Sequence, residues 1–128
     1  INHCKAVEIT MGALAEKLGG DVATWKMAGL LHDADWEETQ TDPSQHTHKT
    51  VQWIKDAGED SEELINTIFS HNHHHNGFRA PETTMEWALY CCDELTGFIV
   101  AVALIRPEKK LATVTVDSVI KKFSQVAF

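Results

Sequence analysis

Apolar side chains recur at intervals of three and four residues along most of the chain, which is the period of an α-helix. The first such stretch covers residues 3–18 and is followed by a pair of glycines, a typical helix end. The second covers residues 21–31, with Asp21 as a plausible N-cap, and is apolar on nearly all sides, as in a central buried helix. The pattern predicts two consecutive helices, the second of them in the core.

Two further helix starts follow from capping signals. Asp42, Pro43 and Gln45 are typical of an N-cap, a first helical residue and an N3 position. On the predicted third helix His46 faces inward, whereas His48, rotated from it by about 200°, faces outward. A similar signal at residues 60–63 predicts a fourth helix, which reaches the histidine-rich tract at 71–75.

The remaining pattern predicts a long helix after Pro81, a short β-prone stretch over residues 111–116 and a final short helix over 119–123. We expect this last helix to pack on the others. Helical periods therefore dominate, and the predicted fold class is an all-α helical bundle.

Length and charge limit the possible partners. A chain of 128 residues that is 43% hydrophobic can bury one core, so we predict a single domain over residues 1–128. A formal net charge of −8 argues against nucleic acid as a partner. The longest uninterrupted apolar run, residues 98–105, is far shorter than the roughly 20 residues of a membrane helix. We therefore expect no membrane partner.

Three cysteines without CxxC spacing suit a reducing compartment, so the predicted location is cytoplasmic. The chain opens with Ile1 and has a proposed ligand at its third residue, which predicts that an N-terminal segment has been trimmed or is absent from this sequence. The pattern does not determine the oligomeric state.

A set of histidines and aspartates supplies the candidate chemistry. Each falls on or next to an apolar stripe, where an unpartnered polar group is costly to bury. Imidazole and carboxylate together are typical ligands of divalent transition metals, so one metal site would satisfy them jointly. His75, one turn beyond the inward-facing His71, remains an alternative ligand. The predicted ligands are His3, His32, Asp33, His46, His71 and Asp93.

Four segments then resemble one family: HDADWEET, DPSQHTHKTVQWI, IFSHNHHHNG and YCCDELTGF. Together they resemble the HD superfamily of metal-dependent phosphohydrolases, and in particular its HDIG-type members. The resemblance implies a single HD-domain bundle with a metal site in its core and one or two divalent ions, chosen from iron, manganese, zinc, cobalt and nickel. It assigns the first ion to His3, His32, Asp33 and Asp93, and the second to His46 and His71.

The resemblance also implies a reaction. Asp33 would bridge the ions and act catalytically by orienting a metal-bound hydroxide that attacks the phosphorus of a small phosphorylated molecule, for which we expect a nucleotide. Many HDIG-type members have a lysine shortly after the HD pair, but Ala34, Asp35 and Trp36 follow here. We therefore expect Lys49 and Arg79 to contact the substrate phosphate.

Among the residues after the HD pair, we expect the acidic side chains to lie on a solvated surface: Asp35, Glu37 and Glu38. Trp36 is a candidate for the wall of a pocket. Two alternatives to hydrolysis stay open. A branch of the same superfamily uses a similar ligand set in di-iron oxygenases. A metal-stabilised signalling module without catalysis is the other alternative, and the missing lysine favours it.

Overall fold

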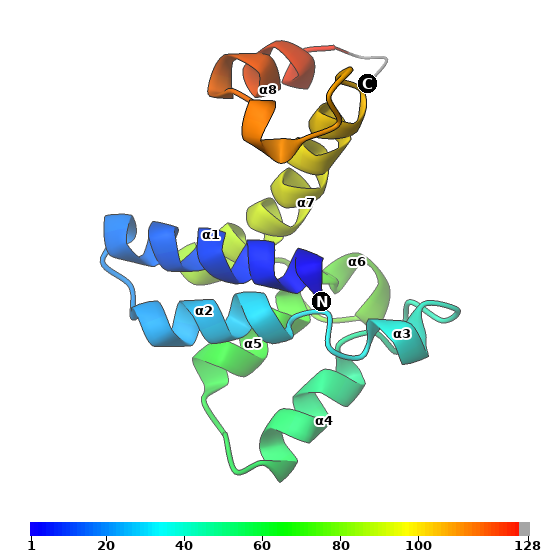
Figure 1. The fold of residues 1–128 in the computed structure, drawn as a ribbon. Coiled ribbons are helices and arrows are strands. Elements are labelled where there is room, and N and C mark those ends of the chain that lie inside the picture. Colours follow the sequence, from blue (N-terminus) through cyan, green and yellow to red (C-terminus); the bar gives the residue numbers. More distant parts are fainter. Residues whose placement is uncertain (126–128) are drawn as a thin grey trace. The chain divides into compact units, whose positions relative to one another are not determined.

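A computed structural model describes residues 1–125 of the chain (Figure 1). The predicted all-α class is confirmed, since no strand occurs in this part of the chain. The elements in chain order are α1 (Asn2–Leu18), α2 (Val22–Leu31), α3 (Trp36–Thr39), α4 (His48–Asp56), α5 (Glu62–His71), α6 (His73–Asn76), α7 (Thr84–Leu104), a 3-10 turn η1 (Leu111–Thr113) and α8 (Val116–Phe123).

The chain divides into two compact units, Ile1–Asp93 and Glu94–Phe128, and the division falls within α7. Unit 1 contains α1 to α6 and the beginning of α7, together with every predicted metal ligand. Unit 2 contains the rest of α7, η1 and α8. The prediction of one domain over residues 1–128 stays a prediction.

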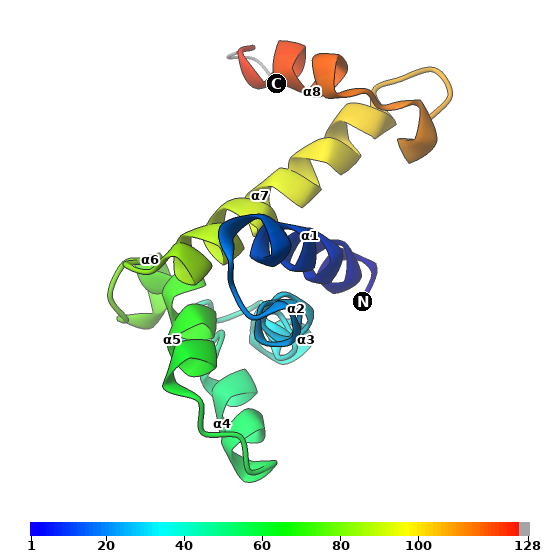
Figure 2. The ribbon, with the colours of Figure 1, turned by 90° about the vertical axis from the view of Figure 1, so that its left-hand side faces the viewer.

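Helices α1 and α2 form a closely packed pair in unit 1, and Figure 1 shows that they run antiparallel, whereas Figure 2 views α2 along its axis. As predicted, α1 is closed by Gly19, which follows its last residue and has a positive φ of 76°. The carboxylate of Asp21 caps α2 by accepting from Thr24 N–H. The crossing depends on Gly29, because a Cβ there would lie 2.9 Å from the backbone of Val7 and Glu8. The missing side chain thus lets the two backbones approach each other.

The core of unit 1 collects apolar side chains from five helices, but α2 is less enclosed than its sequence predicts. Met27 and Leu30 are 41% and 40% exposed, so the expectation of a helix buried on nearly all sides is wrong. Its partners α1 and α5 cover only part of its surface. The largest fully buried apolar side chains of this core are Val7, Met11, Leu64, Ile68, Met85 and Leu89.

Helix starts differ from the predictions at two places. Asp42 accepts a hydrogen bond from Ser44 N–H and so closes a turn instead of capping a helix, and α4 begins only at His48. Thr47, with a positive φ of 82°, separates that turn from the helix. The N-cap of α5 is Ser61, whose hydroxyl accepts from Leu64 N–H. The short helix α3 was not predicted.

In unit 2 the β-prone stretch over residues 111–116 does not form a strand. Leu111–Thr113 form η1, and Val114 and Thr115 have extended backbones that lead into α8. Helix α8 starts earlier than predicted because Thr115 and Ser118 form a reciprocal capping box. Within this unit the rings of Phe98 and Phe123 make an edge contact. The packing of the last helix on the bundle stays a prediction.

By length and composition alone, α7 is apolar enough to cross a membrane, with a mean hydropathy of 1.5 over its best window. Core helices of water-soluble proteins can pass the same test. In unit 1 the first half of α7 buries Met85, Glu86, Leu89 and Cys92 and brings Asp93 to the other candidate ligands. Because 33% of that window is buried, packing in the core accounts for part of its apolar character.

Candidate metal centre

The side chains that the sequence selects as metal ligands come together in unit 1, although they are spread over most of its length. Their carboxylate and imidazole atoms lie within a few ångströms of one another. His3 comes from α1, His32 from the C-cap of α2, Asp33 from the following turn, His46 from the turn before α4, His71 from the last residue of α5 and Asp93 from α7.

Asp33 occupies the middle of the cluster. Its Oδ2 lies 3.7 Å from His3 Nε2 and 3.5 Å from His32 Nε2. Its Oδ1 lies 3.1 Å from His46 Nε2 and 3.8 Å from His71 Nε2. The two oxygens of one carboxylate therefore face two different pairs of histidines.

Asp93 completes the half of the cluster that contains His3 and His32. Its Oδ1 accepts a hydrogen bond from His3 Nε2 at 2.8 Å and lies 3.7 Å from His32 Nε2. Ligand atoms of these three residues lie within 4.8 Å of one another, as do those of His32, Asp33 and His71. Both groups offer the nitrogen and oxygen donors that suit divalent transition metals.

Hydrogen bonds at the far side of each ring fix three of the histidines. The Nδ1–H of His32 donates to Gly29 O at 2.9 Å, and that of His71 donates to Ile68 O at 2.6 Å. In His46, Nδ1–H donates to the Asp35 carboxylate at 2.6 Å. With the proton on Nδ1, each ring turns the lone pair of its Nε2 toward the middle of the cluster.

These lone pairs need a cation. His32 Nε2 is buried and has no hydrogen-bond partner, which is costly for a polar atom. His46 Nε2 and His71 Nε2 lie 3.2 Å apart, so two acceptor lone pairs face each other in the neutral tautomers described above. Because a divalent ion would satisfy all of these atoms, the residues fit the metal that their chemistry implies.

The carboxylates and imidazoles shift each other's pKa values. Burial alone lowers the pKa of His32, but Asp93 and Asp33 outweigh it, so the pKa is raised above the ordinary 6.5. Burial also lowers the pKa of His46, but the carboxylates of Asp33 and Asp35 outweigh it, so this pKa is raised as well. Burial dominates at His71 and lowers its pKa. Despite its own burial, Asp33 has a strongly lowered pKa because these histidines surround it.

Asp35 is a site residue that the sequence did not reveal. We expected a solvated carboxylate, but Asp35 is fully buried. Its Oδ1 accepts from His46 and its Oδ2 accepts from Thr50 N–H at 3.1 Å, while its own N–H donates to Thr50 Oγ1. Only the turn before α4 brings His46 back to Asp35, and the helical pattern contains no signal for that turn.

The other candidate residues lie outside the cluster. His75 is exposed, whereas His71 is buried within the cluster, and His48 faces outward as predicted.

The two residues expected to contact the substrate phosphate both have carboxylate partners. Lys49 Nζ pairs with Glu38 at 2.7 Å on the surface. Arg79 makes a two-pronged ion pair with the buried carboxylate of Glu86. Contact of Lys49 or Arg79 with a substrate phosphate stays a prediction.

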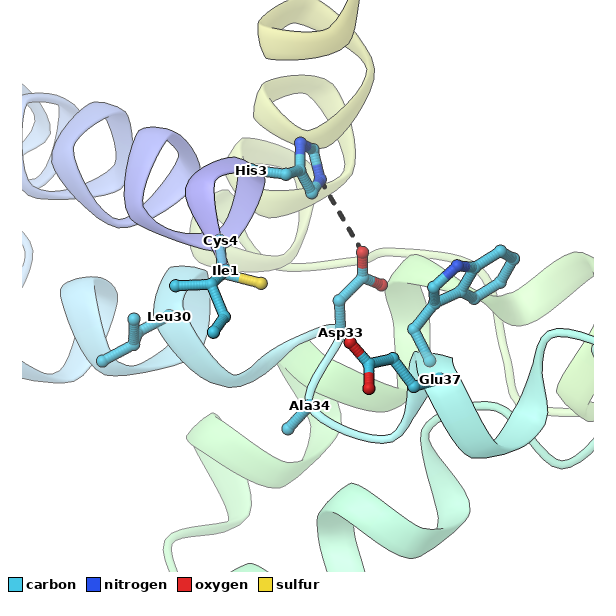
Figure 3. A pocket seen from close by; sticks show the side chains of 8 residues that line it. Ile1, His3, Cys4, Leu30, Asp33, Ala34 and Glu37 are labelled. Atoms are coloured by element: carbon cyan, nitrogen blue, oxygen red, sulfur yellow. Dashed lines mark ion pairs between the residues drawn. The ribbon is translucent and has the colours of Figure 1, made fainter.

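A pocket opens beside His3 and Asp33, and Figure 3 shows these two side chains turned toward each other at its edge. Its volume is about 460 Å³. Trp36, the candidate pocket wall, is among the lining residues, and its ring makes an edge contact with His46 at 5.2 Å between centroids. The pocket thus adjoins the cluster on the side of α3.

Comparison with known proteins gives one family match and several relatives. A family model described as "HD domain" matches residues 1–113. Ribonuclease Y of Helicobacter pylori strain 26695 is 36% identical over 74 residues, which are 58% of this chain and 14% of that protein. Ribonuclease Y of Helicobacter acinonychis strain Sheeba matches with the same identity and coverage. The chain thus spans a small part of the length of these relatives. No solved structure matches.

Proposed function

Because this chain belongs to the HD domain family, a superfamily of metal-dependent phosphohydrolases, we propose that it hydrolyses a phosphoester or phosphoanhydride bond of a small, nucleotide-like molecule. The observation that carries the proposal is the position of Asp33, whose two oxygens face two pairs of histidines. A carboxylate between two metal positions is suited to in-line displacement at phosphorus.

Each half of the cluster has its own role in this proposal. His3, His32, Asp33 and Asp93 would hold one divalent ion, and His46 and His71 would hold a second, with the metal drawn from iron, manganese, zinc, cobalt and nickel. Bound divalent ions supply an activated water and offset the charge of the phosphate oxygens.

Asp33 contributes the catalytic carboxylate. Its pKa is strongly lowered, so it stays ionised and accepts hydrogen bonds over the whole working range of pH. Placed between both pairs of histidines, it orients the attacking water by accepting one of its protons in a hydrogen bond. The hydrogen bonds at Nδ1 keep the rings of His32, His46 and His71 in position without rearrangement during the reaction.

Lys49 and Arg79 remain proposed contacts for the phosphate. Each now has a carboxylate partner, Glu38 for Lys49 and Glu86 for Arg79, and would have to share or leave it to bind substrate. Lys49→Ala and Arg79→Ala test this directly. An unchanged KM in both variants would remove these two residues from the substrate site.

The test of the function is phosphate release from a panel of nucleotides, polyphosphates and simple phosphate esters by the metal-loaded protein. We expect turnover of at least one nucleotide and a loss of roughly a thousandfold or more in Asp33→Asn. Asp42→Asn, which changes an exposed carboxylate in a turn, is the matched control and retains activity. Full metal occupancy without turnover of any compound would contradict the proposal and favour a metal-stabilised signalling module.

A di-iron oxygenase is the second candidate, because the same arrangement of two histidine pairs around Asp33 suits two irons. Two irons per chain with substrate-dependent consumption of dioxygen would favour the oxygenase over the hydrolase.

The name of the relatives, ribonuclease Y, suggests RNA as an alternative substrate. The net charge of −8 supports a small molecule over a polynucleotide, which attracts basic surfaces. We therefore propose a small phosphorylated molecule as the partner, with neither nucleic acid nor a membrane involved. Single-stranded RNA belongs in the assay panel, and its preferential cleavage would overturn this choice. A cytoplasmic location is also proposed, supported by three unpaired cysteines in the described chain.

A further inference from the structure

The pocket beside the metal centre has the size of a ligand site. Its volume of about 460 Å³ lies in the usual range of roughly 300–1,000 Å³ for small-molecule sites. His3 and Asp33, which belong to both the pocket and the cluster, connect the two (Figure 3). The lining residues are Ile1, His3, Cys4, Leu30, Asp33, Ala34, Trp36 and Glu37.

The charge of this lining favours the uncharged nucleoside part of a nucleotide over its phosphates. Among these lining residues there is no lysine or arginine, and the charged side chains beside His3 are the carboxylates of Asp33 and Glu37. Lys26 and Lys49 are instead paired with Glu8 and Glu38. These carboxylates would therefore repel additional phosphate groups of a ligand, whereas they would not repel an uncharged organic group.

Two side chains of the lining are suited to hold a flat, donor-bearing ring. Trp36 is 44% exposed although its ring also contacts His46, so much of the indole remains open to a ligand. Glu37 is exposed, and its carboxylate makes no hydrogen bond or ion pair with any residue that the structure describes. Indole packs well against aromatic rings, and an ionised carboxylate accepts hydrogen bonds from amino groups.

We propose that this pocket binds the nucleoside of a nucleoside monophosphate, with the base against Trp36 and a base amino group donating to Glu37. This inference rests on the proposed function for the position of the phosphate, which lies at the metal centre. It predicts that monophosphates are better substrates than triphosphates. It also predicts a preference for guanine, whose ring N–H and amino group can donate side by side to the two carboxylate oxygens, over uracil, which flanks its N–H with carbonyls.

The experiment measures binding of guanosine and uridine to the metal-loaded protein by ligand-observed NMR titration. Because nucleosides carry no phosphate to cleave, the result is independent of hydrolysis. We expect guanosine to bind more tightly than uridine, and Glu37→Gln to weaken guanosine binding by roughly tenfold through loss of a charged acceptor. Glu16→Gln, an exposed change on α1 outside the pocket, leaves binding unchanged.

The aromatic contact has its own matched pair. Trp36→Leu weakens binding of both nucleosides, whereas Trp53→Leu on α4, with a similar exposure of 43%, does not. Equal binding of guanosine and uridine, absence of binding, or wild-type binding by Glu37→Gln and Trp36→Leu would each overturn the inference. The expected binding pattern without hydrolysis of any nucleotide would support the pocket and contradict the proposed function instead. Hydrolysis that is insensitive to both pocket variants would support the proposed function and contradict the inference about the pocket.

Discussion

At the scale of single residues, the centre depends on where each histidine carries its proton. Three rings donate from Nδ1 to fixed acceptors, and one of these acceptors is a buried carboxylate. A carboxylate behind a ligating imidazole fixes the tautomer and raises the basicity of the ring. Asp35 therefore acts as a positioning residue for His46.

Asp35→Asn tests this role. Asparagine preserves size but removes the charge and one of the two acceptor oxygens that His46 and Thr50 now use. We expect affinity for the second ion to fall by roughly 10- to 100-fold, with little change at the first. Metal titration followed by elemental analysis measures both. Equal weakening of the two sites would indicate a general structural role, and Asp42→Asn again serves as the control.

A second residue-scale prediction concerns pH. In the metal-free protein the pKa values of His32 and His46 are raised above the ordinary value, so these rings keep an added proton to a higher pH than a free imidazole does. Because a metal binds the unprotonated ring, binding displaces those protons, and affinity rises as the pH increases through and above 6.5. Calorimetry in buffers of different ionisation enthalpy should show more protons released at about pH 6.5 than at about pH 9. Affinity that is independent of pH would contradict the assignment of these rings as ligands.

The six candidate ligands were selected from the sequence because histidine and aspartate on apolar stripes need a common partner. The structure brings His46 to the other candidates by a different route from the one predicted: the residue lies in a turn before α4, not on the predicted helix. Asp35 was missed because its burial depends on that turn, which helical periodicity cannot describe.

At the scale of elements, the α1 and α2 pair brings together two candidate ligands of the same half of the cluster. His3 is on α1 and His32 follows α2, and their helices approach closely at Gly29. Capping and periodicity predicted both helices well. The distance between them depends on one missing side chain, which the sequence pattern does not identify as a contact.

Gly29→Ala tests the importance of that approach. The added Cβ would meet backbone atoms of Val7 and Glu8 at 2.9 Å, and backbone cannot move aside as a side chain can. We expect a loss of about 1–3 kcal/mol in the free energy of unfolding and weaker metal binding, because the helices must separate. Gly97→Ala on α7 has nothing within 4 Å of its new Cβ and should be neutral or stabilising. Chemical denaturation and metal titration of both variants provide the comparison.

The segment between α6 and α7 is attached by an ion pair. Arg79 and the backbone N–H groups of Glu82 and Thr83 donate to Glu86, which lowers its pKa from 4.5 to about 2. A lowered carboxyl pKa stabilises the fold above pH 4.5, and this contribution is lost as the pH falls from about 4.5 to about 2.

Glu86→Gln should therefore reduce stability by about 1–3 kcal/mol at neutral pH, and the difference from wild type should vanish near pH 2. Glu82→Gln is the matched control, since Glu82 is largely exposed and its pair with Arg79 is worth little. A difference that persists unchanged at low pH would show that the charge of Glu86 is not its cause.

At the scale of the whole molecule, fold class and family could be predicted from the sequence, whereas its division into units could not. Helical periods cover nearly every element, and the ordered histidines and aspartates carry the family resemblance that the match over residues 1–113 confirms. The division after Asp93 falls inside one continuous apolar helix, where composition does not change. The net charge of −8 is consistent with a molecule that binds divalent cations.

The most direct test of the central claim is the metal content of protein purified without an affinity tag. The His73 to His75 tract should be replaced in a parallel variant, so that ions bound there are not counted. We predict about two divalent ions per chain in both proteins, about one in His71→Ala and a loss of both in Asp33→Ala. Protein that contains no stoichiometric metal, or whose metal content is unaffected by Asp33→Ala, would contradict the account.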